Sequence, residues 1–137
     1  MAQNITTGVN SLVAKAKAKV TTISVKDALE FFDKDDHVFI DLRDIREIKR
    51  SGKIPGAFSC PRGMLEFWID PASPYHKEVF NQDKTYVFYC AAGWRSALSA
   101  QTAQDMGLGP VCHIGGGFSE WSASENPIET QKSRQKP

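Results

Sequence analysis

The chain reads Thr85-Tyr86-Val87-Phe88-Tyr89-Cys90-Ala91-Ala92-Gly93-Trp94-Arg95-Ser96 at its most strongly β-forming point. Residues 85–89 are β-branched or aromatic and lack the polar alternation of a strand with one wet face. Such a run is typical of a strand buried on both faces of a parallel sheet. Residues 96–106 then follow a helical pattern, with Gly107 as the C-cap. The stretch therefore predicts a strand, a short loop and a helix in succession.

Strand and helix patterns alternate on both sides of this stretch. Short apolar runs at Val38–Ile40, ended by Asp41, and at Val111–Ile114, ended by three glycines, predict two more strands. Further helices are expected after a Ser24 N-cap, from Asp44 to Arg50 before Gly52, and from Ser73-Pro74. This alternation predicts an α/β fold: a three-layer domain with a central, mainly parallel sheet flanked by helices.

Length and charge limit the functions to consider. The 137 residues fit one domain, predicted to span 20–127, between a partly flexible N-terminal extension (1–19) and a disordered polar tail (128–137). The formal net charge of +1 argues against nucleic acid or an anionic membrane as a partner. No apolar run approaches the ~18 residues that a membrane span needs. We interpret the lysine-alanine alternation over 14–19 as a solvated helix turn rather than a transit peptide.

The cysteines and histidines are few and scattered. An odd number of cysteines without a secretory signal predicts free thiols and a cytoplasmic location. Cys60 and Cys112 are interpreted as core residues, with a resolving thiol for Cys90 as the alternative. The three histidines lie too far apart in sequence to form a metal site with these cysteines, so no metal is expected. His113, within a predicted strand, is interpreted as a structural histidine.

Cys90 is the candidate nucleophile because it stands where the strongest strand ends. Ligands bind at the carboxyl ends of strands in such sheets. A loop that curls into a helix can point backbone N–H groups inward, and the helix start adds its positive dipole end, which together stabilise a thiolate. Gly93 permits a positive φ, and Arg95 supplies a cation for an oxyanion. The predicted substrate-binding loop consists of Ala91, Ala92, Gly93, Trp94, Arg95 and Ser96. The alternative is a structural cysteine that ends a buried strand.

Three sequence blocks resemble the single-domain rhodanese family from about Val20 to Pro127. They are Ile40-Asp41-Leu42-Arg43 followed by Glu47, Gly52 and Ile54-Pro55-Gly56-Ala57; then Cys90 to Ser96; then Gly115-Gly116-Gly117-Phe118 with Trp121. The resemblance implies a sulfurtransferase that needs no cofactor, because Cys90 itself carries the sulfane sulfur as a covalent persulfide. The implied partners are a small sulfur donor, thiosulfate or a persulfide, and a thiol or protein acceptor.

The resemblance also implies roles for residues that lie behind the loop. Asp41 is expected to orient the loop by accepting from Arg95 or Ser96, with an N-cap or a surface charge as the alternative. We interpret Arg43 and Glu47 as a structural ion pair rather than as substrate contacts. Lys53 stands where many family members have histidine, and it is expected near the loop. Because the loop itself holds only one cation, Arg95, we expect modest use of the dianion thiosulfate.

Other interpretations remain at this stage. The apolar segment 61–75 is either a core helix or a lip over Cys90, with Phe67 and Trp68 as candidate lip residues. A phosphatase or arsenate reductase with a thiolate loop is an enzymatic alternative, but tyrosine-phosphatase-like loops hold one more residue between cysteine and arginine than the four found here. A catalytically weak binding or regulatory module of the rhodanese type is the non-enzymatic alternative. Such modules more often lack the cysteine, which is present here.

Overall fold

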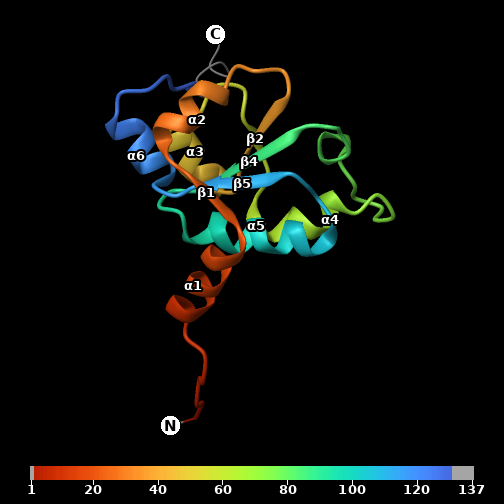
Figure 1. Ribbon diagram of the computed structural model, residues 1–137. Helices are drawn as coiled ribbons and strands as arrows, with labels where there is room; N and C mark the ends of the chain where they lie inside the picture. The colour runs from red at the N-terminus through yellow and green to blue at the C-terminus, as the bar shows by residue number, and fades with distance from the viewer. Residues whose placement is uncertain (1, 131–137) are drawn as a thin grey trace.

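The computed structural model describes residues 2–130 and contains a central parallel sheet of five strands (Figure 1). In spatial order the strands are β1 (Thr21–Ile23), β5 (Val111–Ile114), β4 (Thr85–Tyr89), β2 (His37–Asp41) and β3 (Phe58–Ser59). Every neighbouring pair in this sheet is parallel. The predicted α/β fold class is thus confirmed.

Helices cover both faces of the sheet, which makes three layers. One face carries α1 (Val9–Lys19), α4 (Leu65–Ile69) and α5 (Trp94–Met106). The other face carries α2 (Val25–Phe31), α3 (Ile45–Ser51) and α6 (Gly117–Ala123). Two short 3-10 helices, η1 (Arg62–Met64) and η2 (Glu78–Phe80), lie in the connection between β3 and β4.

The strand β4 contributes to a hydrophobic core on each face. Tyr86 and Phe88 belong, with Cys90, to the core that includes residues of α4 and α5. Val87 and Tyr89 belong to the opposite core, beside residues of α2 and α6. Successive side chains of a strand point to opposite faces. The Cys90 side chain therefore lies on the α5 side of the sheet, just past the carboxyl end of β4.

Local signals predicted three of the helices, α2, α3 and α5. Ser24 caps α2 by accepting from the Asp27 amide, and Asp44 and Glu47 form a complete capping box at α3, which ends at Gly52. The helix α5 ends at Gly107 as predicted but begins at Trp94, because Gly93 serves as its N-cap.

The helix predicted from Ser73-Pro74 is wrong. Asp70 and Ser73 accept hydrogen bonds from the amides of Ala72 and Tyr75, respectively, and so stabilise turns in place of a helix. Between Ser73 and the start of β4, the only helical turn is the 3-10 segment Glu78–Phe80.

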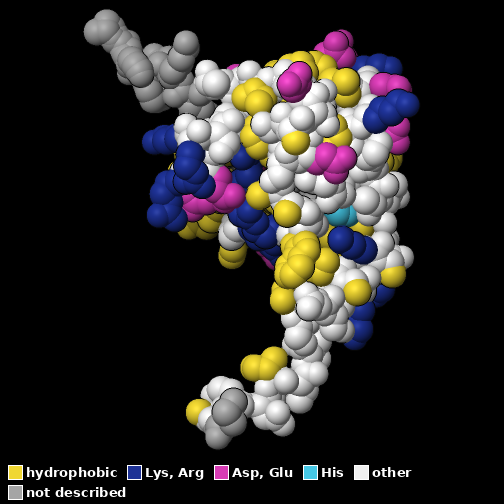
Figure 2. Space-filling model, turned by 90° about the vertical axis from the view of Figure 1, so that its left-hand side faces the viewer, with side chains coloured by type: hydrophobic (Ala, Val, Ile, Leu, Met, Phe, Trp, Pro, Cys, Tyr) yellow, Lys and Arg dark blue, Asp and Glu magenta, His cyan; other side chains and the backbone are white. Residues whose placement is uncertain are grey.

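The segments flanking the predicted domain have distinct structures. Helix α1 packs its buried residues Val13 and Ala16 beside Ala97 of α5, while the segment before α1 extends away from the body of the domain (Figure 2). Of the predicted tail, Glu129 forms an antiparallel bridge with Lys53, and residues 131–137 lie outside the described part of the chain. No helix within residues 2–130 is long and apolar enough to cross a membrane.

Candidate active site

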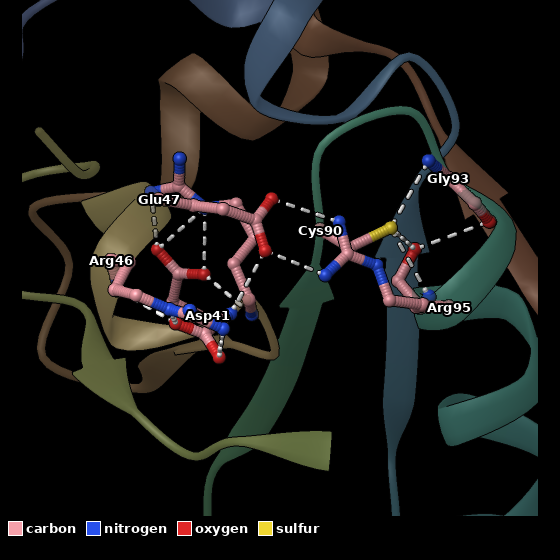
Figure 3. Close-up of polar contacts among 9 residues, drawn as sticks. Asp41, Arg46, Glu47, Cys90, Gly93 and Arg95 are labelled. Carbon is pink, nitrogen blue, oxygen red and sulfur yellow. Dashed lines mark hydrogen bonds and ion pairs between the residues drawn. The ribbon is translucent and has the colours of Figure 1, made fainter. Parts of the chain in front are cut away.

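The Cys90 sulfur lies in a cradle of hydrogen-bond donors (Figure 3). Its Sγ accepts from the amide of Gly93 at 3.1 Å and from the amide of Ser96 at 3.3 Å, and the Ser96 hydroxyl oxygen lies at 3.6 Å. The residue is only 1% exposed, so these donors act away from bulk water. Amide donors aimed at a buried sulfur stabilise negative charge on it. The arrangement is the one predicted for a thiolate nucleophile.

The loop around this sulfur is held by the glycine-rich segment after β5. The Phe118 amide donates to the Cys90 carbonyl at 2.8 Å, and the Ser119 amide donates to the Ala91 carbonyl at 3.0 Å. Gly93 has a φ of +104°, and a Cβ there would overlap the Gly115 carbonyl. The backbone of this segment therefore contacts the loop directly, which explains why two glycine-containing stretches far apart in sequence meet at the site.

Arg95 is bound by Glu47 and does not point at the sulfur. Its guanidinium donates to both carboxylate oxygens of Glu47, at 2.8 and 3.0 Å. The hydrogen bonds from Arg95 lower the pKa of Glu47 against the opposing effect of burial, and those same bonds raise the pKa of Arg95. The predicted pairing of Glu47 with Arg43 is wrong. A local sequence pattern cannot show that α3 approaches the start of α5.

Asp41 is bound by Arg43, two residues away, and not by Arg95 or Ser96 as expected. The two side chains form a buried bidentate pair, with distances of 3.0 Å from Nε to Oδ1 and 2.7 Å from Nη2 to Oδ2. Arg43 also donates to the Gly52 carbonyl at 2.7 Å, and its guanidinium lies 4.2 Å from the centre of the Phe118 ring. The pair thus joins the end of β2 to the turn after α3 and to the segment that holds the Cys90 loop.

Three other predicted site residues lie elsewhere. Lys53 donates to the Ala57 carbonyl at 2.8 Å and approaches Glu129 at 3.8 Å, so it closes a turn and does not face Cys90. Phe67 is 51% exposed beside Tyr75, and Trp68 packs against Phe58 with Lys77 over its ring.

The helix α4, which carries these two aromatic residues, lies beside the C-terminal part of α5, whereas the Cys90 loop enters the N-terminus of α5 (Figure 1). Arg62, just before α4, reaches Thr102 in the same region. The structure therefore does not bring Phe67 and Trp68 to the loop. Trp94, within the loop, is the aromatic residue exposed there, at 47%.

His113 is linked to the site through Ser96, a connection that the sequence did not reveal. The ring nitrogen Nδ1 lies 2.9 Å from the Ser96 hydroxyl, and Nε2 lies 2.9 Å from the Thr22 hydroxyl. Burial, together with a smaller effect of Lys17, lowers the pKa of His113 to about 4. The histidine is therefore neutral near pH 7. Nothing local in the sequence connects residue 22 or residue 113 with residue 90.

The remaining cysteines have no comparable surroundings. Burial raises the pKa of Cys60 to about 12 and that of Cys112 to about 11. Cys112 belongs to the core on the face of the sheet opposite Cys90. Across residues 2–130, no group of three or more His, Cys, Asp or Glu side chains is arranged to hold a metal ion.

The chain is an α/β domain with a doubly covered parallel sheet and a cysteine loop at the carboxyl end of the central strand β4. The family model of the rhodanese-like domain matches residues 24–124, and the chain belongs to that family. The resemblance noted in the sequence is thereby confirmed.

Named relatives include several sulfurtransferases. A mouse protein, thiosulfate sulfurtransferase/rhodanese-like domain-containing protein 3, is 30% identical, with coverage of 81% of this chain and 74% of the mouse protein. The thiosulfate sulfurtransferase GlpE of Glaesserella parasuis is 28% identical and covers 80% of this chain and 93% of its own length.

Similar solved structures include proteins described as a possible phosphatase and as a sulfur transferase. A Rhodopseudomonas palustris protein of unknown function, described as a possible tyrosine phosphatase, is 55% identical with a TM-score of 0.91, over 94% of this chain and 99% of that one. The polysulfide-sulfur transferase homodimer of Wolinella succinogenes is 26% identical with a TM-score of 0.67, over 93% and 90% of the respective chains.

Proposed function

We propose that the protein is a sulfurtransferase that carries a sulfane sulfur as a persulfide on Cys90. The observation that carries the proposal is the buried Cys90 sulfur between the amide donors of Gly93 and Ser96. Such a cradle stabilises the thiolate before attack and a terminal persulfide sulfur after it. The sulfurtransferase names of several relatives support the same reaction class.

The reaction needs no redox change in a bound group. The Cys90 thiolate attacks the outer sulfur of the donor, a bond forms from Sγ to that sulfur, and the sulfur–sulfur bond of the donor breaks. When the donor is thiosulfate, the leaving group is sulfite. When the donor is a persulfide, the leaving group is its parent thiolate. In the second half, a cyanide or thiolate acceptor attacks the outer sulfur, and Cys90 leaves as a thiolate. We therefore propose that no cofactor takes part.

A phosphatase is the second candidate, because the 55% identical structure carries that description. Hydrolysis of an aryl phosphate requires cationic donors around a tetrahedral dianion. Here four residues separate Cys90 from Arg95, one fewer than in tyrosine-phosphatase-like loops, and Arg95 is held by Glu47 with two hydrogen bonds. A loop of this length with its arginine neutralised favours a small terminal sulfur over a phosphate group.

Mass spectrometry after incubation with a donor tests the proposal. The intact protein is treated with thiosulfate or with a low-molecular-weight persulfide, desalted without reductant and weighed. We expect a mass gain of one sulfur atom that is lost in Cys90→Ala and retained in Cys112→Ala. Hydrolysis of an aryl phosphate that depends on Cys90, with no sulfur adduct from any donor, would replace the sulfurtransferase proposal by the phosphatase.

A further inference from the structure

A chain of hydrogen-bonding groups connects the Cys90 sulfur with the surface of the protein. It runs from Sγ to the Ser96 hydroxyl at 3.6 Å, from that hydroxyl to Nδ1 of His113 at 2.9 Å, and from Nε2 to the Thr22 hydroxyl at 2.9 Å. Cys90, Ser96 and His113 are buried, whereas Thr22 is exposed. Each group between the sulfur and water can both donate and accept a hydrogen bond.

The sheet register builds part of this chain into the fold. Thr22 of β1 and His113 of β5 are direct partners in a parallel pair. Side chains of paired residues lie on the same face of a sheet. His113 is also paired with Phe88 of β4, which shares the core that contains Cys90 and residues of α5. The contact between the imidazole and Ser96 therefore follows from strand pairing and from the packing of α5.

The charge state of His113 makes the chain directional. A neutral imidazole carries one hydrogen, on either Nδ1 or Nε2, so it can donate at one end of the chain and accept at the other. Two charged groups interact with members of the chain: Lys17 of α1 helps to lower the pKa of His113, and Arg95 of α5, whose pKa Cys90 helps to raise, is itself paired with Glu47 of α3.

We propose that Ser96, His113 and Thr22 form a relay that moves the thiol proton of Cys90 to water and leaves the Ser96 hydroxyl donating to the thiolate. With a thiol, S–H donates to Ser96, Ser96 donates to Nδ1, and Nε2–H donates to Thr22. On ionisation, the thiol proton passes to Ser96, the Ser96 proton to Nδ1, the Nε2 proton to Thr22, and the Thr22 proton to water. One proton leaves, no bond between heavy atoms changes, and the imidazole ends in its other tautomer.

The relay serves the proposed sulfur transfer, because attack on a donor requires the thiolate. It makes His113 and Thr22 positioning residues that act through Ser96. The Gly93 carbonyl, 3.3 Å from the Ser96 hydroxyl, is the competing acceptor. If that carbonyl keeps the Ser96 hydrogen, the tautomer of His113 stays independent of Cys90, and this difference makes the relay testable without any sulfur donor.

Nitrogen NMR of the imidazole rings provides the test. The protein is labelled with ¹⁵N-histidine and titrated across the pH range in which Cys90 ionises, as located by the rate of iodoacetamide alkylation. We expect His113 to change from the Nε2–H to the Nδ1–H tautomer in that range, while His37 and His76 serve as internal references. The change should be absent in Cys90→Ala. A His113 that keeps one tautomer throughout would overturn the relay.

Substitutions of two serines in α5 distinguish an effect of the relay from a general effect on packing. Ser96→Ala removes the link between Cys90 and His113, whereas Ser99→Ala removes another buried hydroxyl, which donates to the Arg95 carbonyl. We expect alkylation of Cys90 near neutral pH to slow roughly three- to tenfold in Ser96→Ala, the loss typical of one hydrogen bond, and to change little in Ser99→Ala. Equal rates in Ser96→Ala and the wild type would contradict the proposal.

The transfer of the proton from Thr22 to water can be tested separately, through hydrogen exchange of the His113 ring. Thr22 is exposed, so its substitution leaves the core intact. Thr22→Val should slow the exchange of the His113 ring hydrogen with water several-fold, and Thr22→Ser, which keeps the hydroxyl, should not. Unchanged exchange in Thr22→Val would rule out this exit. A relay that passes these tests in a protein that forms no persulfide would refute the proposed function alone.

Discussion

Glu47 determines how much positive charge the Cys90 loop offers to a donor. Its carboxylate accepts from both guanidinium branches of Arg95, the cation of the loop, and also from the Asp44 amide at 3.0 Å. Lys53, the other cation expected there, is engaged with Ala57 and Glu129. A site with its cation paired in this way attracts a dianion weakly, which strengthens the expectation of modest thiosulfate use.

The substitution Glu47→Gln tests this role. Glutamine can still accept from the Asp44 amide, but it no longer neutralises Arg95. We expect sulfur transfer from thiosulfate to cyanide to rise several-fold at low salt, and the gain to disappear as salt screens the freed charge. Steady-state kinetics at two ionic strengths provide the measurement.

The matched control for Glu47→Gln is Glu66→Gln. Glu66 pairs with Arg62 beside α4, away from the loop. Its substitution should leave thiosulfate transfer unchanged. The same gain in both variants, or none in Glu47→Gln, would show that Arg95 does not control the donor.

The buried imidazole of His113 predicts a pH-dependent stability. Burial lowers its pKa from 6.5 to about 4, so between these values the unfolded chain binds a proton that the folded protein does not. The free energy of unfolding should therefore decrease as pH falls from about 6.5 to about 4, by about 2–3 kcal/mol from this group. Urea denaturation at a series of pH values provides the measurement.

A variant isolates this contribution from that of the carboxylates. His113→Asn keeps a polar side chain beside Ser96 but has no group that titrates in this range. The decrease should be smaller in the variant, whatever its stability at neutral pH. Parallel curves for variant and wild type would show that His113 titrates normally.

At the scale of elements, the site depends on the contact between the β4–α5 loop and the segment after β5. Gly93 satisfies two requirements there: a φ of +104° and the absence of a Cβ against the Gly115 carbonyl. Gly117 has a φ of +63°, and a Cβ there would overlap the Ala91 carbonyl. The two glycine-containing stretches are therefore needed together, because each leaves space for the backbone of the other.

Substitution of two glycines by alanine separates strain from steric overlap. Gly56 has a φ of +80°, but its Cβ position is open, so Gly56→Ala should cost about 1–2 kcal/mol of stability from the backbone alone. Gly93→Ala adds a collision with backbone and should cost more and also slow Cys90 alkylation. Chemical denaturation and alkylation rates measure the two effects. Equal costs at both positions would mean that the Gly115 contact is unimportant.

At the scale of the whole molecule, α1 adds to a domain whose family match begins only at residue 24. Ala16 is fully buried where α1 packs beside Ala97, the residue after Ser96. The position of α5, and with it the Ser96 amide at the Cys90 sulfur, therefore depends partly on a helix outside the matched region.

The mixture of acidic and basic side chains seen in Figure 2 accords with the net charge of +1.

Two alanines of α1 test this dependence. Ala16→Leu inserts a larger side chain between α1 and α5 and should destabilise the protein by about 1–3 kcal/mol, the usual cost of overpacking. Ala18→Leu makes the same change at an exposed position of the helix and should have little effect. Thermal unfolding measures stability, and alkylation of Cys90 reports on the loop. If both variants behave alike, α1 does not support the site.

The sequence by itself determined the class of fold and the place of the nucleophile. Hydrophobic runs without polar alternation predicted β2, β4 and β5, and caps at Ser24, Asp44 and Gly107 located helix ends. Cys90 was singled out from its position between the strongest strand and a helix. These features depend on residues close together in the chain, which is why local patterns could predict them.

Only the tertiary structure decided which side chains meet at the site. Arg95 binds Glu47 and Arg43 binds Asp41, although the sequence offered other pairings, and His113 reaches Ser96 and Thr22. Each contact depends on the order β1-β5-β4-β2-β3 and on the helices above those strands. Charged and polar side chains have several compatible partners in a sequence, and the packing of the apolar core determines which of them come within hydrogen-bonding distance.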